Sequence, residues 1–321
     1  GERGAQAVRN GLIFPALWYM IARNLFERNL SRMKKYVALP ALALAGGVGG
    51  FLVRRWQLAS AYVPETGLFT HGAPATLVLM GLLGLAGVVI LLLVLPIKEG
   101  PEDFLPAFHS PETGQITILT AAGLLLMITG VLGLWNGLDS LSLWRTYPDQ
   151  YQMSTLAAQM VASLLCLPAG GGILLMGRMA YRGELNDWAC RLASLPALAG
   201  LVWLFSVHLE NGIEPVLMKY GTQLAAALLL TLAHYYIAAF LFGRPRRRRT
   251  AFLALTGGIL GLTSLADGAG LFQTAATLAF SLSALTFGRA LLRNTWGPAW
   301  PERLEGQMPR AEEEHTSEQD A

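Results

Sequence analysis

The chain has 321 residues, of which 53% are hydrophobic and only 14% charged, and its mean hydropathy is +0.44. Soluble domains carry about a quarter charged residues, so this composition excludes an ordinary soluble globular protein. A membrane-spanning helix needs about 20 apolar residues, and the apolar content suffices for up to about eight of them. The sequence therefore predicts an all-α fold, a polytopic transmembrane helical bundle.

The two ends of the chain differ from its apolar middle. Residues 1–32 hold an apolar stretch that is too short to span a bilayer, and Met33-Lys34-Lys35 then resembles an initiator with a short basic segment. We therefore hypothesise that residues 1–32 are not part of the native protein. Residues 33–291 form the predicted transmembrane domain. Acidic residues dominate the sequence after residue 301, and we expect residues 292–321 to be a disordered cytoplasmic tail.

Eight apolar stretches of suitable length are bounded by charge, proline or glycine. The seventh is the shortest, and only Asp267-Gly268-Ala269-Gly270 separates it from the eighth. Asp-Gly favours a turn and glycine tolerates positive φ, so we expect a tight hairpin there. The predicted spans are 36–56, 74–97, 115–135, 154–180, 188–207, 217–242, 250–266 and 270–291.

The basic residues predict the orientation. Cytoplasmic loops retain Lys and Arg. With the N-terminus inside, the outer side receives only Arg54, Arg55, Arg145 and Lys219 of the 24 basic residues. The sequence therefore predicts an N-in, C-in orientation.

Small residues indicate close helix packing. Gly46 and Gly50 form a GxxxG pair in the first span, which lets another backbone approach closely. Within one chain of eight spans we expect this pair to pack against another span rather than to form a homodimer. Gly81, Gly84 and Gly87 make a similar surface in the second span.

The fourth span carries a narrow polar face. Gln159 and Ser163 are one helical turn apart and therefore lie on the same side of the helix. One interpretation is a ligand-lining surface beside the bend expected at Pro168. The other is interhelical packing, because Gln and Ser commonly join membrane helices.

The sixth span has the most polar face. Gln223, Thr231 and His234 fall within about 80° of arc at 100° per residue. His234 lies about 12 Å in from the end of the span at Phe242. An ionisable residue at that depth is a candidate functional site, whereas a neutral histidine that donates to a neighbouring carbonyl is the structural alternative.

The loop after the sixth span is strongly basic. Such a cluster attracts anionic lipid, with about 1 kcal/mol from each basic residue near the surface. The same charges also hold the loop on the cytoplasmic side, and the two roles are compatible. The candidate lipid contacts are Arg244, Arg246, Arg247, Arg248 and Arg249.

Several kinds of chemistry have no sequence support. HExxH, Cys-x-x-Cys, P-loop and nucleophile-elbow motifs are absent. His208 and His234 are the two histidines near membrane level, but their predicted depths differ too much for them to hold one haem. No carboxylate lies in the middle of a predicted span, which disfavours ion-coupled transport. We therefore expect no catalytic residue, no metal and no cofactor.

Two groups of segments resemble a set of uncharacterised multi-pass membrane proteins of anaerobic bacteria. The first is Met33-Lys34-Lys35-Tyr36 with Arg54-Arg55-Trp56-Gln57-Leu58 and Glu65-Thr66-Gly67. The second runs from Glu214-Pro215-Val216-Leu217 through Tyr235-Tyr236 to Gly243-Arg244-Pro245. The resemblance covers most of residues 33–268. It implies an integral membrane protein and brings no activity, substrate or site with it.

These observations favour a non-catalytic membrane component that works with other proteins. The alternative is a small-molecule or lipid transporter whose path is lined by the fourth and sixth spans, and an intramembrane enzyme comes third. The expected partners are the lipid bilayer and an unidentified membrane or cytoplasmic protein. No nucleic acid partner is expected.

Overall fold

The computed structural model describes residues 35–150, 152–212, 216–298 and 300. The hypothesis on residues 1–32 and most of the predicted tail, residues 299 and 301–321, fall outside these residues, whereas residues 292–296 are helical and not disordered as expected. In the described ranges the chain forms α2 (Lys35–Ser60), β1 (Tyr62–Val63), β2 (Leu68–Phe69), α3 (Pro74–Val94), α4 (Phe104–Phe108), α5 (Thr113–Thr146), η1 (Pro148–Gln150), α6 (Met153–Arg182), α7 (Asp187–Leu192), α8 (Leu195–Glu210), α9 (Leu217–Ala239), α10 (Arg247–Ser264), η2 (Leu265–Asp267) and α11 (Leu271–Trp296).

Eight helical segments of the described chain are long and apolar enough to cross a membrane. The prediction of an all-α bundle with about eight spans is therefore confirmed. The predicted hairpin between the last two spans is also present, because η2 ends at Asp267 and Gly268 adopts a positive φ of 68°.

Several spans are longer than predicted, and the third and the eighth extend furthest beyond their expected ends. The third was expected to end at residue 135, but α5 continues to Thr146, so Asp139 and Arg145 lie in the helix and not in a loop. No proline lies between residues 112 and 147, and Leu138, Leu141 and Leu143 maintain helix-forming character. The eighth span was expected to end at residue 291, and α11 continues to Trp296.

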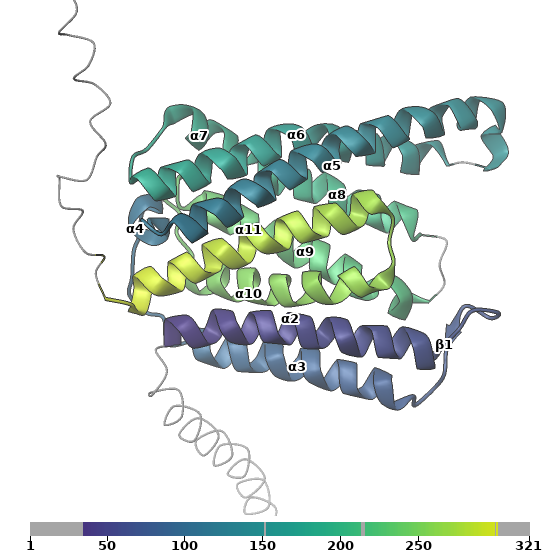
Figure 1. Cartoon of the computed structure of the whole chain (residues 1–321), viewed down its shortest axis with the longest axis horizontal. Coiled ribbons are helices and arrows are strands. Elements are labelled where there is room, and N and C mark those ends of the chain that lie inside the picture. The colour runs from purple at the N-terminus through teal and green to yellow at the C-terminus, as the bar shows by residue number, and fades with distance from the viewer. Residues whose placement is uncertain (1–34, 151, 213–215, 299, 301–321) are drawn as a thin grey trace, which may run out of the picture.

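Helix α11 occupies the centre of the bundle. It packs against α2, α5, α9 and α10 and has the largest buried share of the eight spans. The α5–α6 pair covers one side of the bundle and the α2–α3 pair lies at the opposite edge (Figure 1). Helix α8 packs against both α6 and α9, which completes the arrangement.

Glycines allow several of these contacts. A Cβ added at Gly47 of α2 would lie 2.7 Å from Cδ1 of Leu262 on α10, and one added at Gly50 would clash with Thr263. The glycine-rich face of the first span therefore packs within the chain, as expected. By contrast, a Cβ added at Gly84 of α3 meets no atom within 4 Å.

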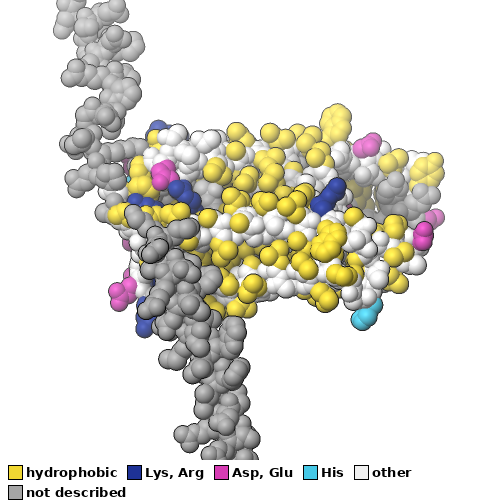
Figure 2. All heavy atoms as spheres, turned by 60° about the horizontal axis from the view of Figure 1, so that its bottom comes forward, with side chains coloured by type: hydrophobic (Ala, Val, Ile, Leu, Met, Phe, Trp, Pro, Cys, Tyr) yellow, Lys and Arg dark blue, Asp and Glu magenta, His cyan; other side chains and the backbone are white. Residues whose placement is uncertain are grey.

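The ends of the bundle are closed by short elements. At one end β1 and β2 form a two-stranded antiparallel hairpin. At the other end α4 inserts Phe108 against Phe240 and Phe287, with ring centroids 5.0 and 5.4 Å apart. Figure 2 shows hydrophobic side chains over the middle of one face and charged side chains mainly toward the two ends, a distribution typical of a protein that spans a bilayer.

Candidate functional site

The polar face of α9 is buried, and its best-defined member is His234. The His234 ring is only 1% exposed. Its Nδ1 lies 2.8 Å from the carbonyl oxygen of Leu230, and its Nε2 lies 2.8 Å from Oγ of Ser283 on α11. A ring protonated on Nδ1 donates to that carbonyl, and its Nε2 shares the single Ser283 hydroxyl proton with the carbonyl oxygen of Phe280, which lies 3.1 Å from the same Oγ. Both ring nitrogens are thus used within the fold.

A row of aromatic and amide groups leads from His234 toward the end of α8. The Phe280 ring meets the His234 ring edge to face at 5.0 Å and stacks on Trp203 at 5.2 Å. Trp203 Nε1 donates to Oε1 of Gln273 at 2.6 Å, and Gln273 Nε2 donates to Oε2 of Glu210 at 2.7 Å. These contacts join α8, α9 and α11. The polar groups of Trp203, Gln273 and Glu210 are hydrogen-bonded to one another.

The other predicted members of this face, Thr231 and Gln223, are also buried. Thr231 donates to the carbonyl of Ala227 one turn earlier and packs against Gly200 of α8. Gln223 is buried, with 6% of its surface exposed.

The polar face of α6 lies at a different interface. Ser163 is fully buried and donates to the carbonyl of Gln159 at 2.8 Å. A Cβ added at Gly130 of α5 would lie 2.7 Å from the carbonyl oxygen of Ser163. Ser163 therefore belongs to the close seam between α5 and α6. The structure does not bring it together with His234, which contacts α11.

A buried polar cluster centred on Arg54 of α2 was not predicted from the sequence. This side chain is only 1% exposed. Its guanidinium donates to Oδ1 of Asp267 at 2.6 Å, to Oε1 of Gln57 at 2.7 Å and to the carbonyl of Lys219 at 2.7 Å. Gln57 in turn donates to the hydroxyl of Thr76 at 2.9 Å. The cluster connects α2, α3, η2 and α9.

Only one of the two carboxylate oxygens of Asp267 accepts a hydrogen bond from a described residue. Its Oδ1 accepts from Arg54, whereas its Oδ2 is buried and has no hydrogen-bond partner among the described residues. The ion pair neutralises Arg54. An arginine can therefore occupy the predicted outer end of the first span without acting as a free basic residue.

The arginines of residues 244–249, the arginine-rich segment, fall into a group that is hydrogen-bonded within the protein and a group that is not. Arg247 donates to the carbonyl of Pro101 at 2.8 Å and to Glu102 at 2.7 Å, and Arg248 donates to the carbonyl of Ile97 at 2.5 Å. These two side chains therefore hold the loop that follows α3. Arg249 donates to the hydroxyl of Tyr236 at 3.0 Å.

The remaining two arginines of the segment, Arg244 and Arg246, are exposed. Neither side chain makes a hydrogen bond or ion pair with any residue in the described ranges. Together with Arg249 and Tyr236 they surround a pocket of about 550 Å³.

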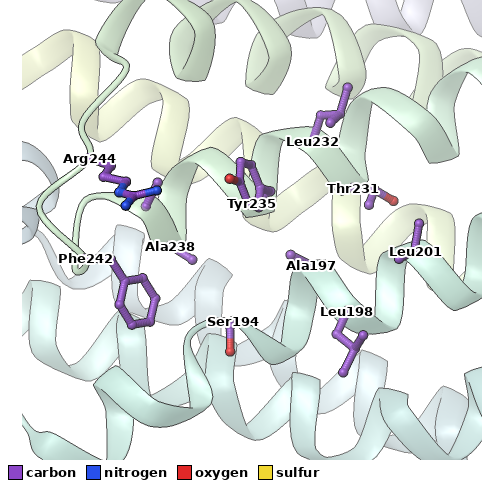
Figure 3. A pocket seen from close by; sticks show the side chains of 11 residues that line it. Ser194, Ala197, Leu198, Leu201, Thr231, Leu232, Tyr235, Ala238, Phe242 and Arg244 are labelled. Carbon is purple, nitrogen blue, oxygen red and sulfur yellow. The ribbon is translucent and has the colours of Figure 1, made fainter.

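A long groove between α8 and α9 meets this pocket. Its main part has a volume of about 640 Å³ and is lined mostly by apolar side chains of both helices (Figure 3). It shares Tyr235, Ala239 and Arg244 with the arginine pocket. A second apolar part of about 570 Å³ adjoins it at Leu201 and extends toward His208.

No family model matches this chain, and neither curated proteins nor solved structures include a significant match to it. In the part of the chain that the structure describes, no three His, Cys, Asp or Glu side chains are grouped so that they could hold a metal ion.

Proposed function

We propose that this protein is a non-catalytic component of a bacterial cytoplasmic membrane that works by association with another protein. The observation that carries the proposal is the use of the intramembrane polar groups. His234, Ser283, Trp203 and Gln273 bind one another or helix carbonyls. Groups that are engaged in this way stabilise the bundle, and they are not available to a passing solute.

The arrangement of the two predicted polar faces supports the same proposal. Ser163 lies in the α5–α6 seam, whereas His234 faces α11. Helix α8 packs against both α6 and α9. A path lined jointly by α6 and α9 would require these helices to rearrange.

A lipid transporter is the second candidate, and a specific observation favours it. The α8–α9 groove is apolar over two adjoining parts and ends at exposed arginines. Such a surface suits a lipid tail and an anionic headgroup. In this alternative the lipid would move along the outside of the bundle and not through its centre.

Site-specific photo-crosslinking in native membranes tests the leading proposal. A photoreactive residue replaces Leu85 on α3, Leu164 on α6 or Leu201 on α8, each of which is more than half exposed. The same residue at Leu119, which is fully buried, is the matched control. The proposal predicts one discrete protein adduct from one of the exposed faces and none from residue 119.

Lipid adducts alone from all three exposed positions, at native expression level, would contradict the component proposal. In that case reconstituted vesicles with a fluorescent phospholipid in one leaflet test the alternative. Protein-dependent movement of the probe to the other leaflet would then favour a lipid transporter.

A further inference from the structure

We propose that the α8–α9 groove and the arginine pocket at its end form one binding site for a single anionic phospholipid. The groove takes an acyl chain, and the pocket takes the phosphate-containing headgroup. This site would serve either functional candidate, because a membrane component and a lipid transporter can both bind a specific lipid.

The headgroup end is defined by charge. Arg244, Arg246 and Arg249 converge on the pocket, and the pocket also includes Tyr235 and Tyr236. Guanidinium groups donate paired hydrogen bonds to phosphate oxygens, and tyrosine rings favour the membrane–water interface. The segment follows directly after α9 and therefore lies at a span end, where lipid phosphates are found.

The guanidinium groups of Arg244 and Arg246 indicate an anionic ligand. Neither of their side chains pairs with a described residue, whereas the neighbouring Arg247 binds Glu102 and the carbonyl of Pro101. Glu102 is thus already paired with Arg247. An anion from outside the described bundle would pair with the two available guanidinium groups.

The tail end is defined by shape and apolarity. Ala197, Leu198 and Leu201 line one side of the groove, and Leu232 with Ala238 lines the other (Figure 3). Its main part is within the roughly 300–1,000 Å³ range of small-molecule sites. Leu198 is 45% exposed and Leu201 is 56% exposed, so an acyl chain can enter sideways from the bilayer.

The continuity of the two parts favours a lipid over a partner helix. Tyr235, Ala239 and Arg244 line both the groove and the arginine pocket. An apolar helix in the groove would leave the adjacent arginines without a counter-charge. A phospholipid presents an anionic group directly joined to a hydrocarbon chain, which matches both parts at once.

The test is native mass spectrometry of the full chain purified in detergent. Phosphatidylglycerol or phosphatidylcholine with identical acyl chains is added, and the retained lipid is counted. We expect one phosphatidylglycerol to be retained in preference to phosphatidylcholine. The triple variant Arg244→Ala/Arg246→Ala/Arg249→Ala should lower its affinity by about tenfold or more, given the contribution of each basic residue near anionic lipid.

Two matched controls distinguish binding at this site from general electrostatic attraction of anionic lipid to the protein. Arg178→Ala/Arg182→Ala removes exposed charge of α6 at the same predicted membrane face and should leave the affinity unchanged. Ala197→Trp fills the groove and should lower the affinity with all arginines present. Leu85→Trp adds the same ring to an exposed position of α3 and should not. Leu198→Trp replaces Ala197→Trp if the latter does not fold.

Four results would overturn the proposal. The first is equal retention of phosphatidylcholine, and the second is equal loss from the α6 arginine variant. The third is retention that persists when folded groove variants carry tryptophan. A transmembrane protein that co-purifies and is displaced by Ala197→Trp but not by phosphatidylglycerol would assign the groove to a partner helix and likewise overturn it.

Discussion

Arg54 of α2 and Asp267 of η2 are 213 residues apart in the sequence and form a buried ion pair of 2.6 Å between Nε and Oδ1. The pair joins the first span to the hairpin between the last two spans. Arg54 also donates to the carbonyl of Lys219 at the start of α9. One guanidinium group thus links three parts of the chain at the same end of the bundle.

Arg54→Met should destabilise the protein strongly. It leaves the Asp267 carboxylate buried without its counter-charge, which costs about 3–5 kcal/mol. Arg55→Met is the matched control, because Arg55 is the exposed neighbour and its loss should change stability by less than about 0.5 kcal/mol. Unfolding by SDS in detergent micelles, followed by circular dichroism, measures both. Equal effects of the two variants would contradict a structural role for the ion pair.

Two adjacent glycines of α6 should respond in opposite ways to alanine. A Cβ at Gly170 would lie 2.5 Å from the carbonyl oxygen of Gly123 on α5, whereas a Cβ at Gly171 meets nothing within 4 Å. Gly170→Ala should force α5 and α6 apart and cost roughly 1–3 kcal/mol. Gly171→Ala should be neutral or stabilise by up to about 1 kcal/mol, because alanine is the better helix former. The same unfolding assay compares them, and similar losses would argue against the close α5–α6 contact.

His234 and Ser283 should be energetically coupled. The hydrogen bond between Nε2 and Oγ is 2.8 Å long and buried, and such bonds between membrane helices contribute about 0.6–1.7 kcal/mol. A double-mutant cycle with His234→Ala and Ser283→Ala measures this term directly. Thr117→Val replaces Ser283→Ala in a control cycle, since Thr117 is exposed and bonds only within α5. Additive effects in the first cycle would show that the two side chains act independently.

The N-in, C-in orientation predicts which loops are accessible from outside the cell. In a Cys190→Ala background, Thr66→Cys in the β1–β2 hairpin should react with a membrane-impermeant maleimide on intact cells. Glu184→Cys in the α6–α7 loop should react only after permeabilisation. Both positions are exposed in the structure, and the remaining Cys166 is buried. The reverse labelling pattern would contradict the predicted orientation.

The features that the sequence predicted well are local ones. Apolar length identifies a span from its own residues, and the Asp267–Gly268 turn needs only its own backbone preferences. The extension of α5 to Thr146 was not predicted, because a membrane span needs only about 20 apolar residues, whereas the helix itself continues beyond them.

The site was predicted only in part, because its partners are distant in the sequence. The position of His234 on a polar face was evident, but Ser283 is 49 residues away and gives no local signal. The role of Arg54 could not be predicted for the same reason. Its sequence context suggests a basic residue at a span end, and only the fold places Asp267 next to it. The arginine-rich segment was identified as one cluster, and its division depends on the loop that binds Arg247 and Arg248.

The central position of α11 has a consequence for biosynthesis. The ribosome makes this helix after the other seven spans of the described residues, yet α11 supplies Gln273 to Trp203 and Ser283 to His234. Until α11 enters the membrane, these groups of α8 and α9 lack their native partners, and an unsatisfied polar group in hydrocarbon is costly. Nascent chains interrupted before residue 271 should therefore be targets for membrane proteases, so the bundle acquires its resistance to degradation in one late step.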